Sequence, residues 1–104
     1  MGLFGKSKEE RILIKADKLT EMAEQEDLNI EKKLALIAEI TEHLINIDNE
    51  VLEHEIELDE DLIEKINDLN QTIKRLSEEI DEEMKDSQKR IERAVKRLEK
   101  IKYP

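Results

Sequence analysis

The feature that most constrains this chain is a run of forty residues, 62–101, that contains no glycine or proline and keeps one apolar seam. Seam residues recur three or four positions apart, the spacing that keeps one face of an α-helix apolar. They are Leu62, Ile66, Leu69, Ile73, Leu76 and Ile80, then, after a phase slip, Met84, Ile91, Val95, Leu98 and Ile101. The slip lies at Ile80, Met84 and Ser87. A helix of this length extends about 60 Å. Because that exceeds the width of a small globule, something else must cover its apolar side.

Composition predicts that the rest of the chain is helical as well. The two glycines are Gly2 and Gly5 and the only proline is Pro104, so no residue between them gives a cheap left-handed turn or breaks a helix. Aromatic residues make up only 2 % of the chain, so the core has to consist of Ile, Leu, Val, Met and Ala. The abundance of Glu, Lys, Leu and Ile favours helices over strands. We therefore predict an all-α protein.

A length of 104 residues allows one domain with a modest core. We expect a flexible N-terminal tail over residues 1–7 and a single helical domain over 8–104. Leu3 and Phe4, beside lysines, are a candidate membrane tip, although a frayed terminus is the simpler interpretation. No apolar run is longer than five residues (34–38), so we expect no transmembrane helix or signal peptide and a cytoplasmic protein. The absence of cysteine excludes disulfides and thiolate chemistry.

Two shorter helices are predicted before the long one. The first covers about residues 8–26, with Ser7 as N-cap and a stripe of Ile12, Ala16, Leu19 and Ala23, widened by Leu13 and Met22. After a corner at 27–29, the second helix begins near Ile30. Its expected buried face is Ile30, Leu34, Ile37, Ile40 (or Thr41), Leu44, Ile47 and Val51. We expect a reversal between about 55 and 60, because the alternative, one helix over 30–101, would be rare outside fibrous proteins.

The third helix, at about residues 60–102, is predicted to be the longest. Leu at the d positions and Ile at the a positions favour a parallel two-stranded coiled coil. The flanking residues are mostly short and uncharged, however, which suits a helix contacted from two sides. We predict coiled-coil-like packing in either a long antiparallel helical hairpin or a three-helix bundle whose C-terminal half projects. Both arrangements leave apolar surface uncovered. We therefore expect a homo-oligomer, specifically a dimer, or a complex with another helical protein, or both.

Charge is divided unevenly along the chain. Residues 31–61 hold two basic and eleven acidic residues (net −9), whereas residues 84–104 hold eight basic and three acidic residues (net +5). Contact between the two regions would orient an antiparallel or head-to-tail assembly. The candidate interaction residues are Lys89, Arg93, Lys96, Arg97 and Lys100 at the basic end and Glu50, Glu53, Glu57 and Asp61 at the acidic end.

Each charged region also suggests an alternative function. The basic end could bind nucleic acid or an anionic membrane, but it lacks aromatic platforms and any recognition motif, so neither is favoured. The acidic block could act as a nucleic-acid mimic, whereas the basic end would be the binding surface of an anion-binding regulator.

The sequence holds weak candidates for metal chemistry and none for catalysis. Glu39 and His43, and likewise Glu50 and His54, are pairs four residues apart on one helical face, a pattern related to but different from the Glu-x-x-His of carboxylate-bridged bundles. A carboxylate/His metal site would therefore have to form on dimerisation. No catalytic triad, phosphate-binding loop or dinucleotide-binding turn is present, so we expect no cofactor and no enzyme. The leading interpretation is a non-catalytic helical interaction protein: an adaptor, an assembly factor or a small regulator.

Overall fold

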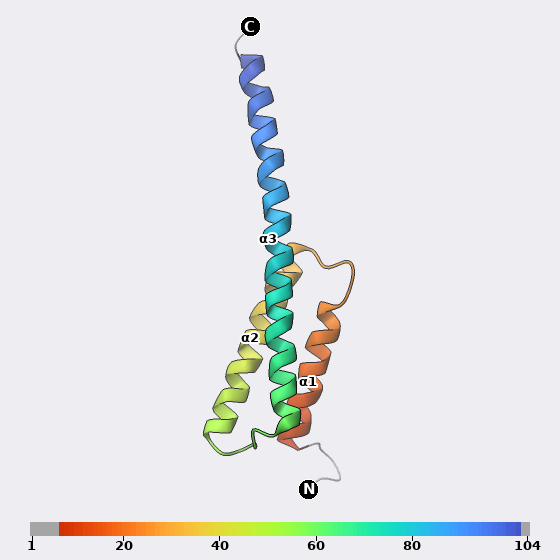
Figure 1. Cartoon of the computed structure of the whole chain (residues 1–104), viewed down its shortest axis with the longest axis vertical. Coiled ribbons are helices and arrows are strands. Elements are labelled where there is room, and N and C mark those ends of the chain that lie inside the picture. The colour runs from red at the N-terminus through yellow and green to blue at the C-terminus, as the bar shows by residue number, and fades with distance from the viewer. Residues whose placement is uncertain (1–6, 103–104) are drawn as a thin grey trace.

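The computed structural model describes residues 7–102, and this part of the chain consists of three α-helices and no strand. They are α1 (Lys8–Ala23), α2 (Ile30–Leu52) and α3 (Glu60–Lys102), and they run alternately up, down and up (Figure 1). All three pairs of helices pack against one another. The prediction of an all-α, three-helix protein whose last helix is longest is confirmed.

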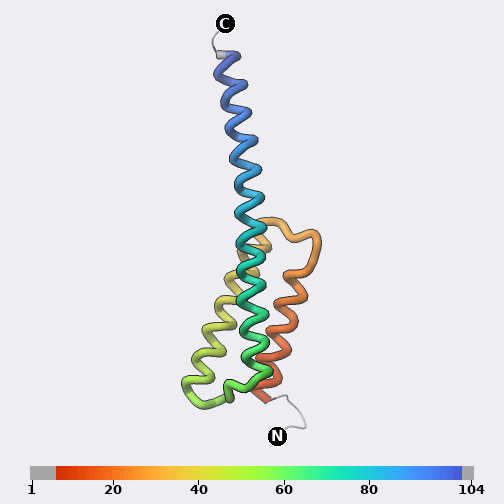
Figure 2. Tube along the Cα trace, in the orientation of Figure 1, coloured from red at the N-terminus to blue at the C-terminus, as the bar shows by residue number. Residues whose placement is uncertain are grey.

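Of the two predicted arrangements, the structure has the three-helix bundle with a projecting C-terminal half. Both α1 and α2 lie along the N-terminal half of α3, and the rest of α3 extends alone (Figure 2). The molecule is accordingly elongated, with extents of 78 × 25 × 17 Å. The hairpin, with α1 and α2 end to end, is wrong because the loop over residues 24–29 turns back sharply and sets α1 beside α2. The single helix over 30–101 is also wrong, since the chain reverses at residues 53–59.

The bundle core is centred on the leucines of α3. Leu62, Leu69 and Leu76 are buried, whereas Ile66 and Ile73, on the other side of the predicted seam, are only half-buried. From α1, the four predicted stripe residues pack against this row, and all of them are buried: Ile12, Ala16, Leu19 and Ala23. Burial of this apolar surface is the main source of stability in a domain of this size.

The second helix is rotated relative to its predicted orientation. Its buried residues are Lys33, Leu36, Ile40, His43 and Ile47. Of the predicted face, Ile30, Ile37, Leu44 and Val51 are only half-buried and Leu34 is exposed. The prediction is confirmed for Ile40 and Ile47 and wrong for the rest of the face, because it kept Lys33 and His43 out of the core, whereas each of them finds a polar partner on another helix.

Short polar side chains begin the helices. Ser7 accepts a hydrogen bond from the backbone N–H of Glu10, and Asn29 accepts one from the N–H of Lys32. Asp59 likewise accepts from the N–H of Leu62, close to the start of α3. These bonds satisfy N–H groups that have no partner within the helix. The first helix ends at Ala23, three residues earlier than predicted, with Glu24 as its C-cap.

The end of α2 shows how a chain without glycine turns back. The N–H of Glu55 donates to the carbonyl of Glu50 at 2.9 Å, and the N–H of His54 donates to the carbonyl of Val51 at 3.1 Å. This is the Schellman pattern, which requires a left-handed residue and usually uses glycine there. Here His54 takes that position with φ of 60°. No glycine is present in this part of the chain, so His54 adopts the conformation itself, which is sterically unfavourable for a residue with a Cβ.

Relieving this strain should stabilise the protein. We expect His54→Gly to raise the free energy of unfolding by about 1 kcal/mol, because glycine adopts positive φ without steric cost. Urea denaturation followed by circular dichroism measures the change as a shift in midpoint. The matched control is Glu53→Gly, one residue earlier at φ −83°, where glycine only adds freedom to the unfolded chain and should destabilise by about 0.5–1 kcal/mol. Equal effects of the two variants would contradict the strain at His54.

Candidate functional site

The most distinctive surface of the molecule is the projecting part of α3, residues 84–102, which we call the arm (Figure 1). Every residue from 84 to 101 is exposed, including the five large apolar residues of the predicted seam: Met84, Ile91, Val95, Leu98 and Ile101. Leu98 exposes 64 % of its surface and Ile91 57 %. Single exposed apolar residues are common, but a row that continues a buried seam indicates a surface built for contact.

Helix lengths explain why the arm is uncovered. The 16 residues of α1 and the 23 of α2 span about 24 and 35 Å, against about 64 Å for the 43 residues of α3. Ile80 is the last buried residue of α3, so coverage stops at the predicted phase slip. The helix itself continues through this point without a break.

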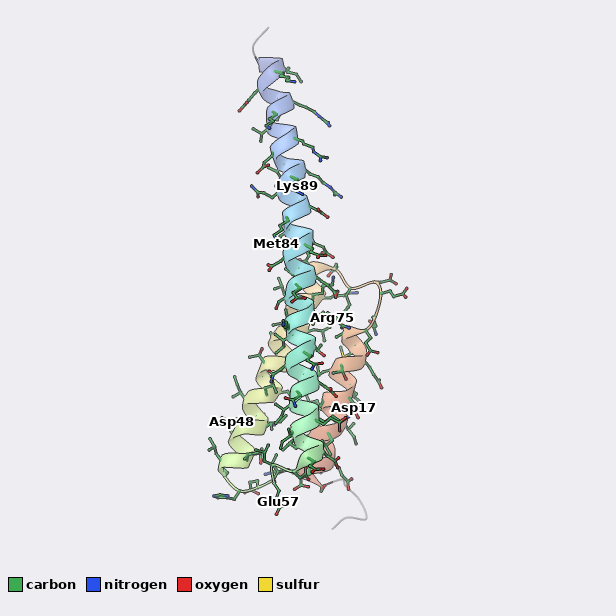
Figure 3. All side chains as sticks on the ribbon, in the orientation of Figure 1. Asp17, Asp48, Glu57, Arg75, Met84 and Lys89 are labelled. Carbon is green, nitrogen blue, oxygen red and sulfur yellow. The ribbon has the colours of Figure 1, made fainter. Side chains whose placement is uncertain are left out.

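Polar contacts close the bundle where the arm begins. Lys33 of α2 is 7 % exposed, and its Nζ lies 3.1 Å from Glu83 and 3.3 Å from Glu79 on α3. Its hydrogen bond to Glu83 raises the pKa of Lys33 above the usual lysine value. On the other side, Arg75 donates to the carbonyl of Ala23 at the end of α1, at 2.8 Å. Figure 3 shows Arg75 on the α1 side of α3, below Met84. The sequence analysis did not predict these contacts of Lys33 and Arg75. The spacing could have indicated the first of them, because Lys33 lies three residues before Leu36 and therefore on the core face of α2.

The predicted basic and acidic interaction residues lie at opposite ends of the molecule, although the acidic region as a whole runs the length of the bundle along α2 (Figure 1). Figure 3 places Lys89 on the arm, whereas Glu57 lies in the α2–α3 loop at the far end of the bundle. The five predicted basic residues, Lys89, Arg93, Lys96, Arg97 and Lys100, are exposed, and none of them forms an ion pair with another described residue. The arm thus presents unpaired positive charge beside its apolar row.

At the acidic end, part of the predicted set has partners within the molecule. Glu50 pairs with Lys8 at 3.2 Å, and this contact is the main cause of the raised pKa of Lys8. The backbone N–H of Glu57 donates to Glu9 on α1. Glu53, Glu57 and Asp61 are exposed, so these carboxylates are available to a partner.

A second apolar surface lies on the bundle, in a groove between α2 and α3. It is lined by Leu44, Ile47, Val51, Leu58 and Ile66, with Asp48 at its edge. Leu44 and Val51 belong to the predicted buried face of α2, and Ile66 to the isoleucine side of the α3 seam. Sequence patterning therefore identified these residues as apolar contact positions, and the three-helix bundle covers them only in part.

The candidate metal residues do not come together. His43 is 3 % exposed and its Nε2 lies 3.1 Å from the carbonyl of Ile12, while Glu39 is exposed beyond it on α2. Glu50 pairs with Lys8, and His54 forms the turn after α2. Within residues 7–101, no group of three or more His, Asp or Glu side chains is placed to share a metal ion. His43 makes its polar contact with α1, and not with Glu39 four residues earlier on its own helix.

The predicted membrane tip, Leu3 and Phe4, lies outside the described residues. None of the three helices is long and apolar enough to cross a membrane.

Searches against protein families, curated proteins and solved structures find no match. A function is therefore inferred from the geometry of this chain itself.

The buried histidine makes folding sensitive to pH. The Ile12 carbonyl can only accept a hydrogen bond, so Nε2 of His43 carries a proton and donates it. Burial, assisted by the nearby charge of Lys15, lowers the pKa of His43 below its ordinary value of 6.5. Below that pH the unfolded chain takes up a proton that the folded protein resists, so stability is lost as pH falls from neutrality toward the folded-state pKa.

We expect His43→Gln, which retains an N–H donor, to flatten this pH dependence. Through His43 the wild type should lose at most about 1.4 kcal/mol per pH unit below pH 6.5. Urea denaturation of both proteins between pH 7.5 and 5 gives the comparison, and carboxylate titrations shared by both cancel in the difference. Parallel curves for the two proteins would show that His43 does not resist protonation in the folded state.

Proposed function

We propose that this chain is a non-catalytic helical interaction protein that acts through the arm of α3. The observation that carries the proposal is the exposed row Met84, Ile91, Val95, Leu98 and Ile101, which continues the seam that the bundle buries farther down the same helix. A helix face of this kind is recognised by laying it against a complementary apolar groove or helix.

The composition of the arm supports a protein partner. Its apolar row contains Ile, Leu, Val and Met with no aromatic residue, as in the interfaces of helical bundles. The three-helix bundle holds one end of α3 fixed, so the arm is presented as an extended helix (Figure 2). This arrangement suits an adaptor, an assembly factor or a small regulator; a cytoplasmic location is part of the same proposal.

The unpaired basic residues favour a second candidate, binding of an external anion. Lys89, Arg93, Lys96, Arg97 and Lys100 give the arm a cationic side that can meet phosphates or anionic lipid headgroups. A basic amphipathic helix is typical of proteins that lie on membrane surfaces. This candidate explains the charge of the arm but leaves the groove on the bundle without a role.

The test compares two pairs of substitutions to glutamine, a residue that keeps helix propensity. Ile91→Gln with Leu98→Gln removes the centre of the apolar row, and Lys89→Gln with Lys96→Gln is the control on the charged side. All four positions are exposed and outside the bundle of their own chain, so both variants should still fold into the three-helix bundle. Immobilised proteins are offered an extract of the native host, and self-association is measured in parallel by sedimentation.

We expect the apolar variant to lose at least about tenfold in binding, and the control to keep most of it, because apolar burial sets the affinity of helical interfaces. If the wild type neither self-associates nor retains a specific protein, the proposed function is wrong. Loss in the control alone, together with binding of the wild type to nucleic acid or anionic vesicles, would favour the anion-binding candidate.

A further inference from the structure

We infer that the partner of the arm is a second copy of this chain. In this assembly the two α3 helices run antiparallel, and each arm occupies the groove between α2 and α3 of the other copy. The inference rests on the proposed function and names its partner.

The first support is the length of α3. Antiparallel pairing centred between Ile80 and Asp81 sets residue 84 opposite 77 and residue 101 opposite 60 of the other copy. The arm of one copy then extends along the bundle half of the other, and only Lys102, opposite residue 59, reaches past the start of that copy's α3. The free and covered parts of α3 are therefore matched in length.

The second support is the apolar pattern in this register. Val95 lies opposite Ile66, which is half-buried and lines the groove. Leu98 lies opposite Ile63, which is 43 % exposed, and Ile91 lies opposite Asn70 at the groove edge. In two of these three pairs an exposed apolar residue of the arm therefore meets an apolar residue that the bundle of the other copy leaves half-buried or exposed. The arm becomes the fourth helix of each bundle, a common way to close a helical core.

The third support is charge. Antiparallel pairing brings residues 84–102, with a net charge of +5, beside the bundle of the other copy, where residues 31–61 of α2, the α2–α3 loop and the start of α3 carry −9. Asp48 lies at the edge of the groove, on the α2 side of the bundle (Figure 3). A parallel dimer would instead place basic arm beside basic arm and acidic end beside acidic end. Charge thus selects the orientation, and apolar burial supplies the affinity.

The absence of cysteine from the chain allows a direct test of orientation and register. Two variants, Asn70→Cys and Ile91→Cys, change exposed positions and are made with tags of different mass. They are mixed, exchanged and oxidised with glutathione disulfide. We expect the mixed 70–91 disulfide to exceed either homodisulfide by at least about tenfold, because cysteines whose Cα atoms are more than about 7 Å apart cannot be bridged.

Sedimentation equilibrium of the wild type at micromolar concentration gives the second measurement, with a dimer expected. Changing Arg93, Lys96, Arg97 and Lys100 to Glu should weaken the dimer by at least about tenfold, and added salt should weaken the wild type. The reversed residues are exposed and lie outside the bundle, and circular dichroism verifies that the variant is folded.

The inference is overturned if the wild type is a folded monomer. It is also overturned if the homodisulfides predominate, because they indicate a parallel dimer. A monomer that binds vesicles containing phosphatidylserine through these basic residues overturns it as well. If the monomeric wild type instead retains another protein through Ile91 and Leu98, the proposed function stands and only the second copy is excluded.

Discussion

The bundle depends on the covering of the leucine row of α3 by α1 and α2. Leu62, Leu69 and Leu76 each lie at the centre of the three-helix contact, and the polar closures at Lys33 and Arg75 lie where this covering ends. Because two shorter helices cover one longer helix, the structure divides α3 into a part that stabilises the fold and a part that faces solvent. The division follows from helix length, since the apolar pattern of α3 continues through both parts.

The same contacts show how a highly charged chain manages its polar groups. Lys33 and His43 occupy core positions because a carboxylate or a carbonyl of another helix lies within hydrogen-bond reach. Lys65 similarly pairs with Asp17 of α1 at 2.6 Å. A buried polar group is tolerated when it is paired, and such pairs restrict which helix faces can meet. The groove between α2 and α3 is a consequence, since turning α2 to bury His43 leaves Leu44 and Val51 at the edge.

Much of the fold was predictable from local patterns. The stripe of α1, its cap at Ser7 and the reversal near residues 55–60 all follow from spacing and capping chemistry within a few residues. The orientation of α2 was not predictable from local patterns, because the partners of Lys33 and His43 are residues distant in sequence. The choice between hairpin and bundle also depended on a loop geometry that residues 24–29 do not reveal by pattern. The basic residues and the apolar row of the arm were identified from sequence, whereas the groove emerged only from the packed helices.

The arm is a helix whose nucleation has already been completed by the bundle. An isolated helix of about 19 residues is marginal in water, since the first turn is costly to form and each later residue adds little. Here the hydrogen bonds of the arm continue an existing ladder, so its helix can unwind from its C-terminal end without disturbing the core. Amide hydrogen exchange along α3 should therefore accelerate from Ile80 toward Lys102, and the position of that gradient reports how far along the helix a partner has docked.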